Sequence, residues 1–369
     1  MAHPSSSAAP AAVSSGPADG LAAPSPWAWR PAAPSVAASP VSLLRLQGPD
    51  SLRFLHGQTS QAIELARPGQ WLSTCCITPT ARLRALAEVL VMEDGAWLVI
   101  RVGEGAGVRQ ALDRVLFPAD AVELGPLREG WLLEPVPGAG DAADSASCGE
   151  STPHTDVAAP SNACWRPLQG GEGFWLGDQL LLLEDAASCP ALEPAARELL
   201  ARPRLEAGER ERWRIQLGWP ACPAELNDET NPFELGLAAR VSLSKGCYVG
   251  QETLAKLATY DGVKQQLRRW VCTAPETGME PGTNLVPGAA LTSATGERAG
   301  WISSVLALPA DGGQAAQWIG LALVRRSALE MGSLTVAREG ADPLTLQLSL
   351  PEPFVAPPVG AGGAGRAVG

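Results

Sequence analysis

Short apolar runs separated by glycine- and proline-rich turns dominate the chain after Lys264. The clearest runs are 267–272, 299–305, 318–324 and 344–348. Each run has the length of a strand and is too short for a typical helix, and turn signals follow each one. We therefore predict a C-terminal all-β barrel or sandwich over residues 266–350, with a domain boundary near 263–266.

Residues 39–265 mix strand-like and helix-like patterns. The apolar runs 41–46, 71–77, 84–92 and 96–102 predict strands, and the stretches 51–58, 108–116, 192–201 and 210–217 predict helices. Asp50 is placed to cap the first helix, and Gly218 closes the last. This mixture favours an α+β fold class with two subdomains here, and 369 residues favour a multi-domain chain.

Three stretches are rich in alanine, proline, serine and glycine: 1–38, about 138–162, and 351–369. Such segments bury too little apolar surface to offset the entropy of ordering them. We therefore expect a disordered N-terminal arm, a flexible insertion and a disordered tail.

Charge and cysteine content narrow the function classes. A formal net charge of −11 argues against direct nucleic-acid binding, because an acidic surface repels phosphate. The eight cysteines and three histidines show neither a CxxC pair nor zinc-finger spacing, so no metal site is expected. No apolar run has the length of a membrane helix and the N-terminus lacks a signal-peptide pattern, so we expect no membrane association, reduced thiols and a cytoplasmic location.

The segment KGCYVGQE, residues 245–252, gathers several reactive side chains. Lys245 lies two residues before Cys247, and its charge would lower the pKa of the thiol if the two side chains converge. Tyr248 and Gln251 could contact a heterocycle through a ring face and an amide. From spacing alone, a glycine turn around a buried structural cysteine is favoured over a site.

Other candidates lie upstream. Gln216 and Glu234 are polar residues in apolar surroundings and could hydrogen-bond a polar ring system, although capping and solvent exposure are the simpler alternatives. Arg82 and Arg84 could face an anion such as a glutamate tail, or could be surface charge. A lone histidine such as His56 is more often structural than a ligand.

Taken in order, these segments resemble the YgfZ-type folate-binding proteins, which are relatives of the glycine-cleavage T-protein. KGCYVGQE matches the K-G-C-Y-x-G-Q-E signature of that family. Residues 212–237 resemble its R-I-x-x-G-x-P, E-L and N-P-x-E-x-G-L pattern, and FLHGQTS (54–60) and FPADAVEL (117–124) also match in order. The resemblance spans roughly residues 41–350.

The resemblance implies a ring-like, three-domain T-protein-like arrangement with a C-terminal β-barrel domain and a central cavity for tetrahydrofolate. It implies that 39–265 is the folate-binding region, and that the protein supports assembly or maintenance of iron–sulfur enzymes, including tRNA-modifying ones. Folate and iron–sulfur enzymes or assembly factors are thus the expected partners. Cys247 and Lys245 occupy the positions tied to function, and Gln216 occupies the position of a pterin-contacting glutamate in T-proteins.

A folate-dependent aminomethyltransferase is the alternative function. T-proteins carry an acidic residue that assists aminomethyl transfer in the loop matching residues 78–87, but that stretch here has Arg82 and Arg84 and no Asp or Glu. Without a carboxylate, the reaction lacks its acid–base and charge-stabilising partner. We therefore expect folate binding without aminomethyl transfer.

Overall fold

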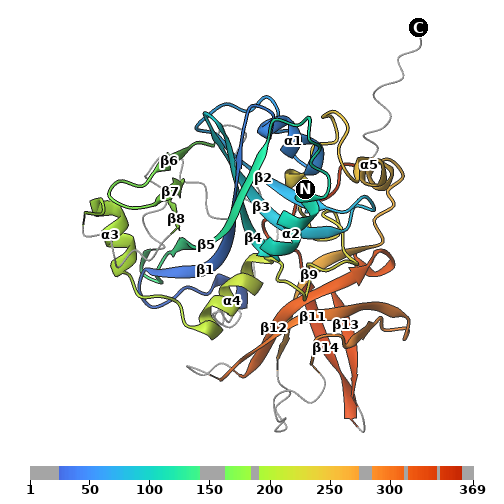
Figure 1. Cartoon of the computed structure of the whole chain (residues 1–369). Coiled ribbons are helices and arrows are strands. Elements are labelled where there is room, and N and C mark those ends of the chain that lie inside the picture. Colours follow the sequence, from blue (N-terminus) through green and yellow to red (C-terminus); the bar gives the residue numbers. More distant parts are fainter. Residues whose placement is uncertain are drawn as a thin grey trace, which may run out of the picture.

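The computed structural model describes residues 25–141, 163–183, 191–273, 285–310, 315–338 and 341–359. Its larger part is an antiparallel eight-stranded sheet with the strand order β2-β3-β4-β1-β5-β8-β7-β6 (Figure 1). The strands are β1 (Ser35–Gln47), β2 (Trp71–Ile77), β3 (Leu83–Met92), β4 (Gly95–Gly103), β5 (Glu123–Val136), β6 (Trp165–Pro167), β7 (Gly173–Leu176) and β8 (Gln179–Leu182). The two expected subdomains therefore share one continuous sheet.

Strand β1 lies at the centre of this sheet and pairs with β4 on one side and β5 on the other. Successive side chains of a strand point to opposite faces. Leu44 and Leu46 pack into a core on one face, while Val41 and Leu43 pack into a core on the other. Burial on both faces explains why 41–46 reads as an almost continuous apolar run.

Helices cover the sheet at several points. The helices α1 (Ser51–Gln58) and α2 (Gly105–Asp113) pack on the β1–β4 part, and α3 (Pro194–Ala201) packs beside β7 and β8. Helix α4 (Ala207–Leu217) lies between the sheet and the C-terminal domain (Figure 1). It begins with a capping box formed by Glu206 and Glu209 and ends at Gly218, whose φ of 65° is left-handed.

The C-terminal domain is a closed barrel with the strand order β10-β11-β12-β9-β14-β13. Its strands are β9 (Gln265–Thr273), β10 (Ala290–Thr292), β11 (Arg298–Leu308), β12 (Gln317–Arg325), β13 (Ser333–Arg338) and β14 (Ala341–Ser349). Trp270 is fully buried in it and donates from Nε1 to the Leu321 carbonyl at 3.0 Å. A Cβ at Gly320 would lie 2.4 Å from the Trp270 ring, so only glycine fits there.

One apolar core joins the two regions. It contains residues of β2, β3, α4, the 245–252 segment, helix α5 (Gln251–Thr259) and the barrel strands β9 and β12. Among them are Leu86, Ile215, Tyr248 and Leu321, all less than a tenth exposed. The candidate residues of the sequence therefore lie around the junction of sheet and barrel.

The α+β class with a C-terminal barrel is confirmed, while details at the edges differ. Asp50 precedes α1 without a side-chain capping bond, and its carboxylate accepts instead from the Ala121 N–H at 3.0 Å. Residues 25–38 do not belong to a disordered arm, because they include the 3₁₀ helix η1 (Pro26–Ala28) and the start of β1. Tryptophans at 27 and 29 supply the apolar surface that the rest of the arm lacks.

The expected tail also begins later than residue 351. Phe354 packs against the joining core, and Val355 bridges to Leu237. The positions 1–24 of the arm, 142–162 of the insertion and 360–369 of the tail lie outside the described residues.

Candidate functional site

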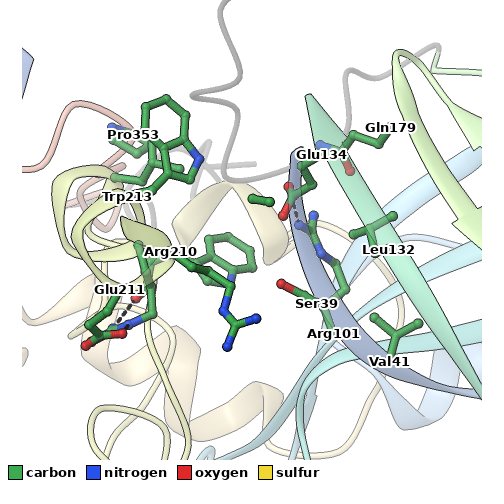
Figure 2. Close-up of a pocket in the computed structure, with 14 residues that line it drawn as sticks. Ser39, Val41, Arg101, Leu132, Glu134, Gln179, Arg210, Glu211, Trp213 and Pro353 are labelled. Atoms are coloured by element: carbon green, nitrogen blue, oxygen red, sulfur yellow. Dashed lines mark hydrogen bonds and ion pairs between the residues drawn. The ribbon is translucent and has the colours of Figure 1, made fainter. Parts of the chain in front are cut away.

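A pocket of about 170 Å³ lies between α4 and the β1–β4–β5 part of the sheet. Figure 2 shows Trp213, Arg210 and Glu211 on the helix side, facing Arg101 and Glu134 on the strands. The remaining lining residues are Ala37, Ser39, Val41, Leu132, Gln179, Arg214, Leu217, Trp219 and Pro353. Two indole rings and a few convergent polar groups suit a planar, polar heterocycle.

Buried charges fix the strand side of this pocket. Arg101 pairs with Glu134 at 2.7 Å, and Glu88 pairs with Arg101 at 3.7 Å and with Arg240 of the 3₁₀ helix η4 (Ala238–Arg240) at 2.9 Å. The centroid of the Trp219 ring lies near two of these guanidinium groups, 5.0 Å from that of Arg101 and 5.3 Å from that of Arg240. Cation–π contacts and ion pairs thus hold Trp219 in place as a rigid wall.

One residue of the pocket wall carries a buried polar atom that lacks a partner. The Oε1 of Gln179, on β8, is buried and accepts no hydrogen bond within the described part of the chain. A buried acceptor without a donor costs about 1–3 kcal/mol, so most such groups in proteins are paired. An N–H donor on a bound ring would satisfy this oxygen.

Lys245 is buried where the 245–252 segment meets the end of α1. Its Nζ donates to the carbonyls of His56, Thr59 and Gln61 at 2.5, 2.6 and 2.8 Å. An ammonium group has three N–H donors, so the three carbonyls use all of them. Burial lowers the pKa of Lys245 to about 7, because the charged form loses its hydration.

Cys247 lies on the outer side of the same segment and is exposed. The condition under which Lys245 would lower the pKa of the thiol is not met, because the ammonium is directed at the three carbonyls beside α1. Lys245 therefore acts as an anchor for the segment that presents Cys247. The alternative of a buried structural cysteine is wrong for this position.

His56 approaches the same segment from α1. Its Nδ1 accepts from the N–H groups of Ile63 and Glu64 at 3.2 and 3.1 Å, which places the ring proton on Nε2. Burial, followed by the charge of Lys245, lowers the pKa of His56. A Cβ at Gly246 would lie 3.9 Å from Nε2, so the ring reaches the residue next to Cys247.

The two other candidates of the signature serve the segment itself. Tyr248 belongs to the joining core, and burial raises its pKa to about 12. Its buried hydroxyl has no hydrogen-bond partner among the described residues. Gln251 donates from Nε2 to the Lys245 carbonyl at 3.2 Å, which closes the turn.

Gln216 lies on α4 and is 5% exposed. Its Nε2 donates to the Trp29 carbonyl at 3.3 Å, while its Oε1 is buried without a partner in the described chain. The N-terminal residues around Trp29 therefore cover the position that the family resemblance assigns to pterin contact.

Arg82 and Glu234 share a separate open cleft of about 780 Å³ near the barrel. Arg82 donates to the Glu229 carbonyl, and Glu234 accepts from the Asn231 N–H at 3.0 Å. Burial raises the pKa of Glu234. Seven of the candidate residues thus fall into three places, namely the 245–252 segment, the covered flank of α4 and this cleft, while Arg84 lines another pocket beside α2.

Sequence reasoning missed the pocket walls Trp213, Trp219 and Gln179. The chain has twelve tryptophans and only two tyrosines, and four of the tryptophans (27, 29, 213 and 219) lie beside α4. That enrichment is the signal that could have found them.

The described residues form neither a metal-binding cluster nor a membrane-spanning helix. No group of three or more His, Cys, Asp or Glu side chains with metal-binding geometry occurs in this part of the chain. None of its helices is both long and apolar enough to cross a membrane.

The sheet, the barrel and the helix between them define a glycine-cleavage T-protein-like fold. Aminomethyltransferase T of the glycine cleavage system from Bartonella henselae matches with a TM-score of 0.58 and 17% identity, over 88% of both chains. The T-protein-like arrangement expected from the sequence is thereby confirmed, while the narrower YgfZ-type assignment stays a prediction.

A chloroplastic protein of Arabidopsis thaliana, provisionally named a transferase, is 28% identical to this chain over 308 residues. The match covers 80% of this chain and 66% of the Arabidopsis protein, so the chain spans just under two thirds of that relative. No protein-family model matches the sequence.

Proposed function

We propose that the protein is a folate-binding accessory protein that supports iron–sulfur enzymes, with the Cys247 thiol as its reactive group. The observation that carries the folate part is the pocket beside α4, walled by Trp213 and Trp219 and containing the unpartnered Oε1 of Gln179. A pterin ring offers an aromatic face to the indoles and N–H donors to that oxygen.

The pocket dimensions fit part of a folate. A volume of about 170 Å³ is below the roughly 300–1,000 Å³ of pockets that enclose drug-sized ligands. It suits a fused bicyclic ring, with the rest of the molecule outside. Tetrahydrofolate would supply one-carbon or redox chemistry when bound, while the protein residues hold the ring, exclude water and position the Arg101–Glu134 pair beside it.

The accessory role rests on the signature segment. Lys245, His56 and Gln251 hold a turn that leaves Cys247 exposed, which suits a thiol that meets a partner protein. The proposed partners are iron–sulfur enzymes or their assembly factors. A cytoplasmic location stays a prediction; the Arabidopsis relative is named as chloroplastic.

A folate-dependent aminomethyltransferase is the second candidate, because the similar solved structure is an aminomethyltransferase and the Arabidopsis relative is named a transferase. The placement of acids on β3 argues against it. Glu88 is the acid of β3, and it is fully buried, accepts from Ser73 at 2.5 Å and pairs with two arginines. A carboxylate committed in this way is a poor partner for a reacting amine.

The iron–sulfur role is tested by complementation of a deletion strain that lacks the endogenous counterpart. We expect the wild-type chain to restore the activity of an iron–sulfur dehydratase, and Cys247→Ala to restore less than about a tenth of it. Cys222→Ala, which removes another exposed thiol, is the matched control and should complement fully. Full rescue by Cys247→Ala would refute the thiol role.

The enzymatic alternative is tested with tetrahydrofolate and an aminomethyl donor. We expect tetrahydrofolate to quench the tryptophan fluorescence of the protein without formation of methylene-tetrahydrofolate. Turnover above the uncatalysed rate would favour the transferase instead.

A further inference from the structure

A short N-terminal segment, residues 25–30, lies along the flank of α4 that carries Arg212 and Gln216. We call it the strap. Its Trp27 ring lies 4.7 Å from the Arg269 guanidinium, and its Trp29 ring lies 5.1 Å from that of Arg212. Two indoles thus cover two guanidinium groups, in the manner in which a bound aromatic ring would.

Polar atoms beneath the strap are left without partners. They are Gln216 Oε1, Arg212 Nε and Arg269 Nε, all buried and unpaired within the described part of the chain. Gln216 and Arg269 are only 5% and 6% exposed. Each unpaired buried group costs free energy, and native proteins have few of them. Three such atoms around one surface indicate that the strap does not provide the contacts for which this surface is suited.

The strap makes few polar contacts with the rest of the protein. Trp27 packs against the joining core and Trp29 against a small cluster that includes Trp213, but both indoles remain partly exposed, and Ser25, Ala28 and Arg30 are exposed. Its one side-chain hydrogen bond to α4 is the 3.3 Å contact between Gln216 Nε2 and the Trp29 carbonyl. The chain is fixed firmly only from the next residue onward, where the Pro31 carbonyl accepts from the Ala139 N–H at 2.8 Å. Opening of the strap at Pro31 would break the contact with Gln216 and leave the Pro31–Ala139 hydrogen bond in place.

The strap surface and the pocket meet at Trp213. The guanidinium of Arg30 lies 5.2 Å from the Trp213 ring, and Trp213 also lines the pocket. The pocket alone is too small for a whole folate. The surface under the strap adjoins this pocket, and it carries two unpaired donors, Arg212 Nε and Arg269 Nε, and one unpaired acceptor, Gln216 Oε1.

We propose that Arg212, Gln216 and Arg269 form a second half of the ligand site, and that Trp27 and Trp29 fill it until a ligand displaces them. The ligand class is a planar heterocyclic or aryl group that carries an N–H for Gln216 Oε1 and a carbonyl or carboxylate oxygen for the Nε donors of Arg212 and Arg269. The two Nη atoms of Arg269 already donate to the carbonyls of Gln216 and Leu350. The identity of that ligand as a reduced folate rests on the function proposed above. Because only molecules with an open strap can bind the ligand, the apparent dissociation constant equals the intrinsic one divided by the open fraction.

Two measurements on the full-length protein test whether the strap and the ligand compete for this surface. Chymotrypsin cleaves after tryptophan, so release of fragments 1–27 or 1–29, followed by mass spectrometry, reports strap opening. We expect saturating tetrahydrofolate to speed this cleavage at least about 5-fold. The double variant Trp27→Ala/Trp29→Ala should bind tetrahydrofolate at least about 5-fold more tightly than wild type by calorimetry. Trp131→Ala, an exposed tryptophan outside the site, is the control and should bind as wild type.

The outcomes separate this inference from the proposed function. If tetrahydrofolate binds wild type but neither speeds cleavage nor binds the double variant more tightly, the strap is part of the fold and the inference is wrong while folate binding stands. If it binds neither protein, both are overturned. Should the double variant fail to fold, the cleavage of wild type still decides.

Discussion

The Nζ atom of Lys245 lies 4.2 Å from the centroid of the Tyr248 ring, within a cage of three backbone carbonyls. Lys245 and Tyr248 thus hold each other in place, and Cys247, which lies between them in the sequence, is left exposed. A lysine in this position is needed for the geometry of the segment rather than for direct contact with the thiol.

Replacing this lysine should loosen the segment. In Lys245→Met the three carbonyls lose their donors, so we expect a loss of roughly 2–4 kcal/mol in the free energy of unfolding. Urea denaturation measures it. Lys256→Ala is the control, because Lys256 is exposed and pairs only with Glu252 on the surface of α5. This substitution should leave the free energy of unfolding unchanged within error. Equal stability of Lys245→Met and wild type would contradict the anchoring role.

The cysteines should react in two groups. Cys75 and Cys76 are buried, and burial raises the pKa of each thiol to about 12. At pH 8 only about 10⁻⁴ of such a thiol is ionised, and the thiolate is the form that reacts. We expect iodoacetamide to modify Cys247 in the native protein while Cys75 and Cys76 react only in urea, as peptide mass spectrometry will show. Rapid native labelling of the buried pair would count against the packing described.

The buried ion network should carry a large part of the stability. Glu88→Ala leaves Arg240 buried without its carboxylate, which costs about 3–5 kcal/mol when one partner of a buried pair is removed. Glu252→Ala, at an exposed position, should leave the melting temperature unchanged. Thermal unfolding followed by circular dichroism measures both, and a neutral effect of Glu88→Ala would show that the network is not buried.

Glu234 should make stability depend on pH. Its folded-state pKa is raised by burial, so the folded chain binds the proton more tightly than the unfolded chain does. Above the folded-state pKa, the buried charge of Glu234 destabilises the folded chain by its full amount. This destabilisation disappears as the pH falls to the unfolded-state pKa of about 4.3. Glu234→Gln keeps an oxygen for the Asn231 N–H. We expect it to melt higher than wild type at pH 7, with the difference vanishing near pH 4; a difference that is constant with pH would be inconsistent with this assignment.

Much of the fold follows from local pattern. Residues 51–58 form a helix with the predicted bounds, and the four apolar runs of the C-terminal domain are all strands, because their periodicity and turn residues agree with their environment. The strands β10 and β13 were not singled out, since β10 has only three residues and β13 is no continuous apolar run. Their pairing is decided by closure of the barrel.

The site was less predictable because it depends on contacts between distant segments. The signature draws attention to Lys245, yet the carbonyls that accept from it lie about 185 residues earlier in the sequence. The pocket joins β8, β5 and α4, and the strap lies within a stretch whose composition predicts disorder. No local spacing rule brings Gln179 or Trp29 to α4.

Calorimetric titration of tetrahydrofolate into wild type and Gln179→Leu tests the central claim, folate binding beside α4, most directly. Wild type should bind one equivalent. The Leu variant should melt at the same or a higher temperature, since it removes an unpaired buried oxygen, and yet bind at least about 10-fold more weakly, because a ring N–H loses its acceptor. Equal affinity of wild type and Gln179→Leu for tetrahydrofolate would contradict a folate site in this pocket. So would the absence of binding heat both with wild type and with Trp27→Ala/Trp29→Ala.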